Sequence, residues 1–192
     1  MIIGLTGTFG AGKGVVAKFL VSNHNFKHFS ARDFIVEEIK NRDLTVNRDT
    51  MTAVANDLRD KFGPTYILEQ LVNKAEKYGG DAVVESIRAV AEAEYVKKKG
   101  GYVLAIDADP KIRFNRIIRR NSETDNVSFE KWCKQEQAES NNSDPAVQNI
   151  PGSMAKANKV IVNNKSLSAL LFEVEDWLKT LSGDVGGRFL LK

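Results

Sequence analysis

The sequence predicts an α/β fold of three layers, in which a five-stranded parallel sheet is covered by helices on both faces. Short apolar runs typical of buried strands alternate along the chain with longer segments of helical periodicity. This alternation is typical of parallel sheets, because each crossover between parallel strands needs a connection that usually contains a helix. At 192 residues, 42% of them hydrophobic, the chain is long enough for one domain with a substantial core.

The five strands are predicted where apolar and β-branched residues run together between turn residues. They cover residues 1–6, 26–30, 81–87, 101–107 and 159–163. The first of these runs is almost continuously apolar and leads directly into a glycine-rich loop, which is typical of a strand buried on both faces.

Helices are predicted where apolar side chains recur every three or four residues. They cover residues 13–23, 31–42, 50–62, 66–77, 89–99 and 110–120. The last helix of the chain has the clearest pattern, because Ser166 is a suitable N-cap for an amphipathic segment. Its apolar stripe consists of Leu167, Leu170, Leu171, Val174, Trp177, Leu178 and Leu181.

One polar segment interrupts the alternation. Residues 121–153 are rich in Asn, Ser, Gln and Glu, and only a short helix around 129–139 is predicted within them. A polar insertion of this length is often a lid over an active site, and residues 121–153 are called the lid segment below. We therefore expect a single domain over residues 1–182 with this lid inserted, followed by a C-terminal tail over 183–192.

The glycine-rich loop after the first strand carries the most specific motif. Gly7, Gly12 and Lys13 satisfy the pattern Gly-x4-Gly-Lys of a phosphate-binding P-loop. Small residues let the backbone N–H groups surround a polyphosphate, and the lysine reaches its outer oxygens. The helix that follows directs its positive dipole end at the same anion. The residues expected to contact the donor nucleotide are Gly7, Phe9, Gly10, Ala11, Gly12, Lys13, Gly14 and Val15.

The motif departs from the usual pattern after its lysine. A P-loop normally continues with Ser or Thr, whose hydroxyl ligates Mg2+, whereas Gly14 and Val15 follow here. We expect the triphosphate, water molecules and carboxylates elsewhere to hold Mg2+, which commonly keeps several waters in proteins.

Polar residues also follow other predicted strands. Ser30, Arg32 and Asp33 follow the second strand, and Glu85 and Arg88 lie at the end of the third. Because ligands of an open parallel sheet bind beyond the carboxyl ends of its strands, we expect these groups to converge near the P-loop.

In these motifs the chain resembles the P-loop nucleoside monophosphate kinase superfamily, and more closely dephospho-CoA kinases, archaeal dephospho-CoA-kinase-like proteins and adenylate-kinase-like proteins. The resemblance extends over roughly residues 1–180 and rests on segments that occur in the expected order. These segments are residues 7–13, 30–33, 85–88 and 157–164.

The resemblance implies a role for several of these residues. Lys13 would neutralise the β- and γ-phosphates of ATP, and Arg88 would bind the phosphate of the acceptor with a bidentate guanidinium contact. Glu85 stands where relatives usually have an Asp, and would hold Mg2+ through water. The alternative for Glu85 and Arg88 is an ion pair on the surface at the end of a strand.

Four arginines lead into the lid segment. Arg113, Arg116 and Arg120 are spaced along one helix, and Arg119 adds a fourth charge. In the resembling kinases this helix end supplies an arginine that stacks on the base or binds phosphate, so Arg116 and Arg119 are expected at the donor and Arg120 as a catalytic charge. The alternative is a solvated helix face, which applies to Arg113 in particular. The resemblance also places Asn163 beside the donor base.

The acceptor side departs further from the family pattern. Adenylate kinases have an arginine three residues after the Asp that follows the second strand, and Val36 stands there in this chain. Arg32 or Arg59 is expected to replace that arginine. Ser30 and Asp33 would contact the acceptor, and Asp33 is the candidate base, although it could simply stabilise the start of a helix.

Together these features predict an ATP- and Mg2+-dependent kinase whose acceptor is a nucleoside or deoxynucleoside monophosphate. Dephospho-CoA is the alternative acceptor, and a nucleotide-binding protein of low turnover is the alternative from another class. Nucleic acid is not expected as a partner, because the net charge is only +3 and the basic stripe lacks interleaved aromatics.

The cysteine content and the apolar runs indicate the cellular compartment in which we expect the protein. Cys133 is the sole cysteine, which excludes an internal disulfide and fits a reducing compartment. No apolar run approaches the length of a membrane span. We expect a cytoplasmic protein that is a monomer or a weak dimer and acts on small-molecule nucleotides.

Overall fold

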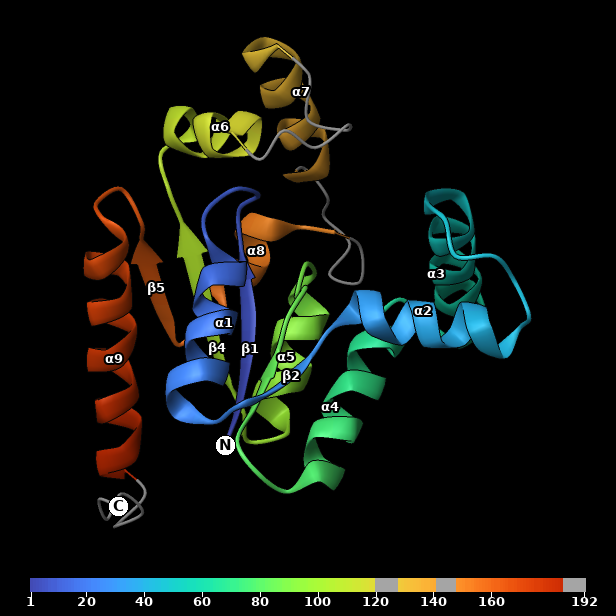
Figure 1. The fold of residues 1–192 in the computed structure, drawn as a ribbon, viewed down its shortest axis with the longest axis horizontal. Helices are drawn as coiled ribbons and strands as arrows, with labels where there is room; N and C mark the ends of the chain where they lie inside the picture. The colour runs from blue at the N-terminus through green and yellow to red at the C-terminus, as the bar shows by residue number, and fades with distance from the viewer. Residues whose placement is uncertain (120–127, 141–147, 185–192) are drawn as a thin grey trace.

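A computed structural model describes residues 1–119, 128–140 and 148–184, and it confirms the predicted α/β class. The described part contains a parallel sheet whose strands lie in the order β2-β3-β1-β4-β5. The strands are β1 (Ile2–Gly7), β2 (Lys27–Phe29), β3 (Ala82–Val84), β4 (Tyr102–Asp107) and β5 (Lys159–Val162). Since β1 lies at the centre, the loop that follows it emerges in the middle of one edge of the sheet (Figure 1).

Nine helices occur in the described residues, and most begin within two residues of the predicted start. They are α1 (Lys13–His24), α2 (Ala31–Asn41), α3 (Arg48–Phe62), α4 (Tyr66–Tyr78), α5 (Val90–Lys98), α6 (Pro110–Arg119), α7 (Phe129–Ser140), α8 (Ile150–Ala155) and α9 (Leu167–Asp184). No helix of the described part is both long and apolar enough to cross a membrane.

Alternate residues of the strands enter two separate cores, one on each face of the sheet. Ile3 and Leu5 of β1 pack with α1 and α9 on one face, where Leu170 and Val174 are buried. On the other face α4 and α5 cover the sheet, and Val84 lies in their core. The period of two along the strands thus explains why both faces need covering helices.

Helices α2 and α3 stand beside the sheet and form a third core with α4 (Figure 1). Their buried residues are Ile35, Ile39, Val54, Ala55, Leu58 and Ile67. Arg42 forms ion pairs that connect the two helices. Its Nε lies 3.0 Å from Oε1 of Glu38 in α2, and its Nη1 lies 2.6 Å from Oδ2 of Asp57 in α3. This unit forms one wall of the larger cavity described below.

The structure adds a helix that the sequence does not predict. Helix α8, at the end of the lid segment, packs against β1 and α5. Ser153 is fully buried there, and its Oγ lies 2.7 Å from Oγ1 of Thr6. The end of the lid segment is therefore built into the core. A lid role for the rest of the segment stays a prediction, since residues 120–127 and 141–147 lie outside the described part.

Two predicted boundaries also shift. The third strand ends at Val84 instead of residue 87, because the backbone turns at Ser86, whose φ is 76°. Helix α9 continues to Asp184, past the predicted domain boundary at 182, and the rest of the tail lies outside the described residues.

Among the glycines whose surroundings the structure describes, Gly7 leaves the least room for a side chain. Its φ is 126°, and a Cβ there would lie 1.9 Å from the carbonyl oxygen of Ile106. We expect Gly7→Ala to lower the free energy of unfolding by at least about 3 kcal/mol, as measured by denaturant titration. Gly14→Ala is the matched control, because a Cβ at Gly14 meets nothing within 4 Å. Equal stability of the two variants would contradict this account.

Candidate functional site

The P-loop lies between β1 and α1 at the carboxyl edge of the sheet, as predicted. The ammonium group of Lys13 donates to the carbonyl oxygens of Gly7 and Thr8, at 2.7 Å and 2.8 Å. In the described residues the backbone N–H groups of Gly10 and Gly12 donate to no protein acceptor. A loop with a lysine and unpaired N–H groups at a helix N-terminus is suited to bind an anion.

The structure shows open space where the usual P-loop hydroxyl is missing. Gly14 is exposed, and Val15 is 41% exposed at the first turn of α1. Asp107, the last residue of β4, accepts a 2.6 Å bond from Oγ1 of Thr8. Asp107 thus holds the loop itself. Within the described residues no group of three or more acidic, His or Cys side chains could hold a metal ion.

A cavity of about 370 Å³ lies against the P-loop on the side of α6 and β5. It is lined by Gly10, Gly12, Val15, Arg116, Asn163, Leu167 and Leu170. Arg116 donates to the backbone oxygen of Asn163 at 3.1 Å, which joins the end of α6 to the loop after β5. The structure therefore brings Arg116 and Asn163 together with the P-loop.

The side chain of Asn163, expected beside the donor base, makes a hydrogen bond to the P-loop in the structure. Its amide nitrogen donates to the carbonyl oxygen of Ala11 at 2.7 Å, and the residue is 7% exposed. Its side-chain amide hence holds the P-loop in the structure. A contact with the donor base stays a prediction.

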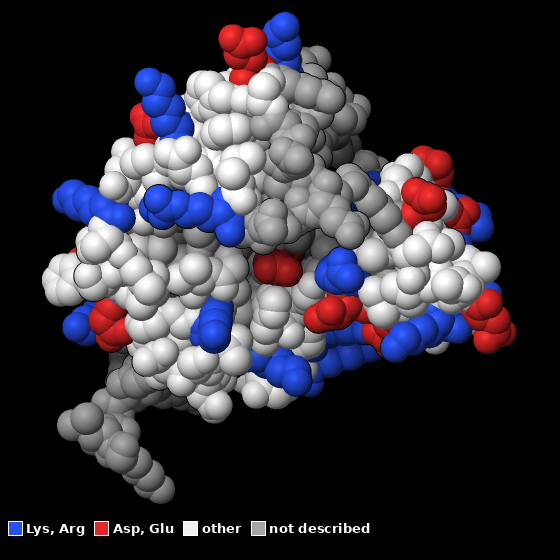
Figure 2. All heavy atoms as spheres, turned by 45° about the horizontal axis from the view of Figure 1, so that its top comes forward, with Lys and Arg blue, Asp and Glu red and all other residues white. Residues whose placement is uncertain are grey.

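A larger cavity of about 690 Å³ lies between the α2–α3 unit, α4 and the start of α5, and no P-loop residue is among those that line it. One part of its wall is apolar and includes Ile35, Met51, Leu68 and Leu71. The rest is charged, with Arg32, Arg59 and Arg88 together with Asp60, Glu85 and Glu92. Figure 2 shows that this face of the molecule is hollowed, with both basic and acidic side chains at the border of the hollow.

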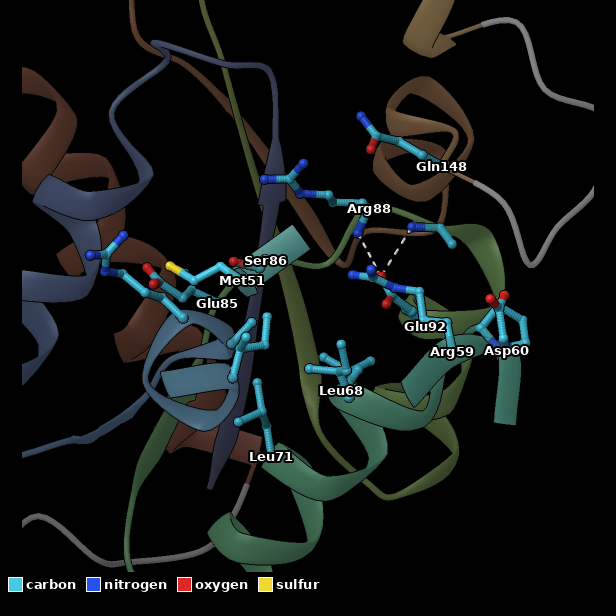
Figure 3. Close-up of a pocket in the computed structure, with 16 residues that line it drawn as sticks. Met51, Arg59, Asp60, Leu68, Leu71, Glu85, Ser86, Arg88, Glu92 and Gln148 are labelled. Carbon is cyan, nitrogen blue, oxygen red and sulfur yellow. Dashed lines mark hydrogen bonds between the residues drawn. The ribbon is translucent and has the colours of Figure 1, made fainter. Parts of the chain in front are cut away.

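Three predicted acceptor arginines line this cavity from three different elements. Arg32 comes from α2, Arg59 from α3, and Arg88 from the segment between β3 and α5. In Figure 3 Arg59 points across the cavity toward Glu92, whereas the Arg88 side chain points away from Glu92. The cavity can thus offer guanidinium groups to an anionic ligand from more than one side.

Ser30 and Asp33 are not among the residues that line the cavity. Ser30 is buried and caps α2, where its hydroxyl accepts a bond of 3.4 Å from the backbone N–H of Asp33. Asp33 is exposed in the first turn of that helix. The structure therefore gives both residues a helix-start role, and their contact with an acceptor stays a prediction.

Glu85 lines the cavity beside a histidine that belongs to none of the sequence motifs. Nε2 of His28 lies 3.4 Å from Oε2 of Glu85. The adjacent Glu85 carboxylate raises the pKa of His28 above its ordinary 6.5, against the effect of burial. His28 in turn lowers the pKa of Glu85 below its ordinary 4.5, and Ser30 and Lys13 lower it further. Glu85 is thus kept ionised at the edge between the cavity and the P-loop.

This pair makes the stability of the protein depend on pH. Because the pKa of His28 is raised, its contribution is complete below the unfolded value of 6.5 and is lost as the pH rises through the folded value. The lowered pKa of Glu85 has the opposite effect. The stability that Glu85 contributes is complete above 4.5 and is lost only as the pH falls below that value. We expect the stability difference between the wild type and His28→Asn to shrink between about pH 6 and pH 8 in urea titrations. A difference that stays constant over that range would contradict the pairing.

Glu92 is a cavity residue that was not predicted from the sequence. Its Oε2 accepts bonds from the backbone N–H groups of Arg88 and Ala89, at 2.7 Å and 3.2 Å (Figure 3). The residue is 9% exposed, and burial raises the pKa of its carboxyl. Glu92 therefore fixes the turn that carries Arg88. In the sequence Glu92 looks like an ordinary charged residue on a helix face, and its spacing from other residues does not indicate a role at a site.

The arginines of α6 divide into different environments. Arg113 is 4% exposed and bonds to carbonyl oxygens and to Glu136, so the alternative of a solvated helix face is wrong for this residue. Arg119 is exposed at the end of the helix, and its role at the donor stays a prediction. Arg120, the predicted catalytic charge, lies outside the described residues. Phe9 is 50% exposed at the tip of the P-loop.

Comparison with known proteins gives relatives over most of the chain. The profile of a protein family described as AAA domain matches residues 3–146. A UPF0200 protein of Methanococcus maripaludis is 28% identical over 184 residues, which cover 94% of this chain and 97% of that protein. A UPF0200 protein of Methanocaldococcus jannaschii is 29% identical over 185 residues, which cover 94% of this chain and 90% of the relative.

Solved structures share the fold at low sequence identity. The shikimate kinase of Acinetobacter baumannii, in complex with shikimate, has a TM-score of 0.62 at 15% identity and covers 93% of each chain. The shikimate kinase of Aquifex aeolicus has a TM-score of 0.56 at 16% identity, over 97% of this chain and 100% of that one. These likenesses confirm the fold of a P-loop kinase-like protein.

Proposed function

The chain belongs to the AAA-domain family, and we propose that it is an ATP-dependent kinase whose acceptor is a nucleoside or deoxynucleoside monophosphate. One observation carries the proposal. Two separate cavities are each lined by arginine, and the smaller one is lined by the P-loop itself. The larger one is lined by Glu85, whose pKa is lowered in part by the charge of Lys13. A phosphoryl donor and a phosphoryl acceptor need such an arrangement, because the transferred group must pass between them beside the lysine.

The smaller cavity suits the donor nucleotide. The free N–H groups of the P-loop bind its phosphates, and the space between Arg116 and Leu167 accepts the base and sugar. Lys13 exchanges its bonds to the carbonyl oxygens of Gly7 and Thr8 for bonds to phosphate oxygens. Its charge then stabilises the negative charge on the transferred group.

The larger cavity suits the acceptor. Its volume of about 690 Å³ falls within the range of small-molecule sites. Arg88 and Arg32 bind the acceptor phosphate, and the apolar wall around Leu68 and Leu71 contacts a flat base. Phosphate as the attacking group needs no strong base, which fits the absence of Asp33 from the described cavity lining.

The residues present fit Mg2+ only through water. Gly14 and Val15 offer no hydroxyl, so Glu85 is the group that would hold the hydrated ion, with its carboxylate kept ionised. When bound, the ion neutralises charge on the donor phosphates.

The missing hydroxyl tests the alternative of a binding protein with low turnover. We expect Gly14→Ser to raise the rate of ADP formation by less than about tenfold, because a water-held ion already serves the reaction. The side chain has room, since a Cβ at Gly14 meets nothing within 4 Å. A rise of several hundredfold from a nearly inactive parent, for Gly14→Ser or Val15→Thr, would favour the binding protein instead.

The proposal as a whole is tested by a coupled ADP-release assay with Mg-ATP against a panel of acceptors. The panel contains nucleoside and deoxynucleoside monophosphates, dephospho-CoA and shikimate, and Lys13→Ala serves as the inactive control. Fast turnover with a monophosphate supports the proposal. Turnover with dephospho-CoA alone would establish transfer to a hydroxyl, and turnover with shikimate alone would give the activity named for the structural neighbours. ATP binding without turnover of any acceptor would overturn the proposal that this protein is a kinase.

A further inference from the structure

Two carbonyl groups of the P-loop are held from outside the loop. The carbonyl oxygen of Phe9 accepts a bond of 3.2 Å from Nη1 of Arg113, which comes from α6. The carbonyl oxygen of Ala11 accepts the 2.7 Å bond from Nδ2 of Asn163, which follows β5. Both donors are less than a tenth exposed, so water does not compete strongly for these bonds.

These bonds determine where the next N–H groups point. A trans peptide is planar, so its C=O and the following N–H point in opposite directions. No cis peptide occurs in the described chain. With the Phe9 and Ala11 carbonyls directed at Arg113 and Asn163, the N–H groups of Gly10 and Gly12 are directed away from them. Both N–H groups are among the P-loop donors for which the described part offers no protein acceptor.

Arg113 is itself fixed by several partners. Its Nε donates to the carbonyl oxygen of Ala108 at 2.8 Å, and its guanidinium lies 4.9 Å from the ring centre of Trp132. Nη2 donates to Glu136 at 2.9 Å, and Nη1 bonds to the same carboxylate. Because an unpaired charge at this depth would be strongly destabilising, Glu136 keeps Arg113 in place. Arg113 therefore connects the P-loop to α7 in the lid segment.

We propose that Asn163 and Arg113 are positioning residues for the donor phosphates, acting by orienting the N–H groups of Gly12 and Gly10 toward them. This inference rests on the proposed function only in that the P-loop must bind a polyphosphate. It assigns Asn163 to the phosphates and not to the base. It also makes the Arg113–Glu136 pair part of the donor site, although neither side chain touches the nucleotide.

The experiment measures binding of two probes, ATP and inorganic tripolyphosphate, by calorimetry. Tripolyphosphate has no base, so it reports on the phosphate site alone. We expect Asn163→Ala to weaken the binding of both probes by about tenfold. A contact with the base would instead weaken ATP and leave tripolyphosphate unchanged, which would overturn the inference.

Two further variants separate positioning from a general loss of structure. Asn115→Ala removes an exposed asparagine of α6 and should leave both affinities unchanged. Glu136→Gln keeps the shape of the partner of Arg113 but removes its charge, and should weaken both probes while the acceptor KM stays constant. Wild-type affinity for tripolyphosphate in Asn163→Ala would overturn the inference for Asn163, and in Glu136→Gln it would overturn the inference for Arg113. If the wild type bound neither probe, the proposed function itself would fail.

Discussion

Replacement of Lys13 by alanine is expected to lower kcat by about a thousandfold, more than the replacement of any other residue of the site. Lys13 is the cation of the P-loop, and its ammonium lies within the loop, where it donates to the carbonyl oxygens of Gly7 and Thr8. Its charge acts most strongly on the transferred phosphoryl group as negative charge develops there. The measurement is steady-state turnover of the best acceptor at saturating ATP.

Lys18→Ala is the matched control for this prediction. Lys18 lies on the same helix, but its side chain is exposed and faces away from the core. We expect wild-type turnover for this variant. A Lys13→Ala protein that is folded and keeps more than a tenth of the wild-type kcat would show that the P-loop lysine is not the main catalytic charge.

Replacement of Arg88 is expected to act on the acceptor alone. Arg88 lines the larger cavity, and Glu92 fixes its backbone. We expect Arg88→Ala to lower kcat/KM for the monophosphate by about a hundredfold or more, because it removes a charged contact to the acceptor phosphate. Arg88→Lys should recover only part of this loss, since an ammonium cannot make the bidentate contact. The dissociation constant of ATP, measured separately, should change little.

Lys98→Ala provides the control, because Lys98 is exposed at the end of α5, the helix that follows Arg88. Parallel losses of ATP affinity and acceptor kcat/KM in Arg88→Ala would point to a general disturbance of the site. A wild-type acceptor KM would show that the larger cavity does not bind the acceptor through Arg88.

The sequence was sufficient for the features that depend on local pattern. The strands, the P-loop and the cap of α9 at Ser166 follow from periodicity, glycine spacing and a short polar residue at a helix start. Helix α8 could not be predicted in this way. It has only six residues, including Pro151 and Gly152, and its stability comes from distant contacts such as the bond between Thr6 and Ser153.

The role of a side chain could be predicted where the residue belongs to a sequence motif. It could not be predicted where the role depends on a partner that is distant in the sequence. Glu92 and Glu94 look alike in sequence, yet Glu92 is buried at the cavity and Glu94 pairs with Lys156 on the surface. Arg113 likewise resembles the other arginines of α6. Its partner Glu136 lies 23 residues away in a polar segment, and spacing alone does not connect the two.

The central claim is that this protein transfers a phosphoryl group from ATP, bound at the P-loop and the smaller cavity, to a monophosphate bound in the larger cavity. The most direct test uses ATP labelled on its γ-phosphate, with the wild type and Lys13→Ala, and identifies the labelled product. The account predicts that the label appears in a nucleoside diphosphate, in proportion to the ADP formed, and that Lys13→Ala transfers almost none. Recovery of the label only as inorganic phosphate, or no release at all from bound ATP, would contradict it.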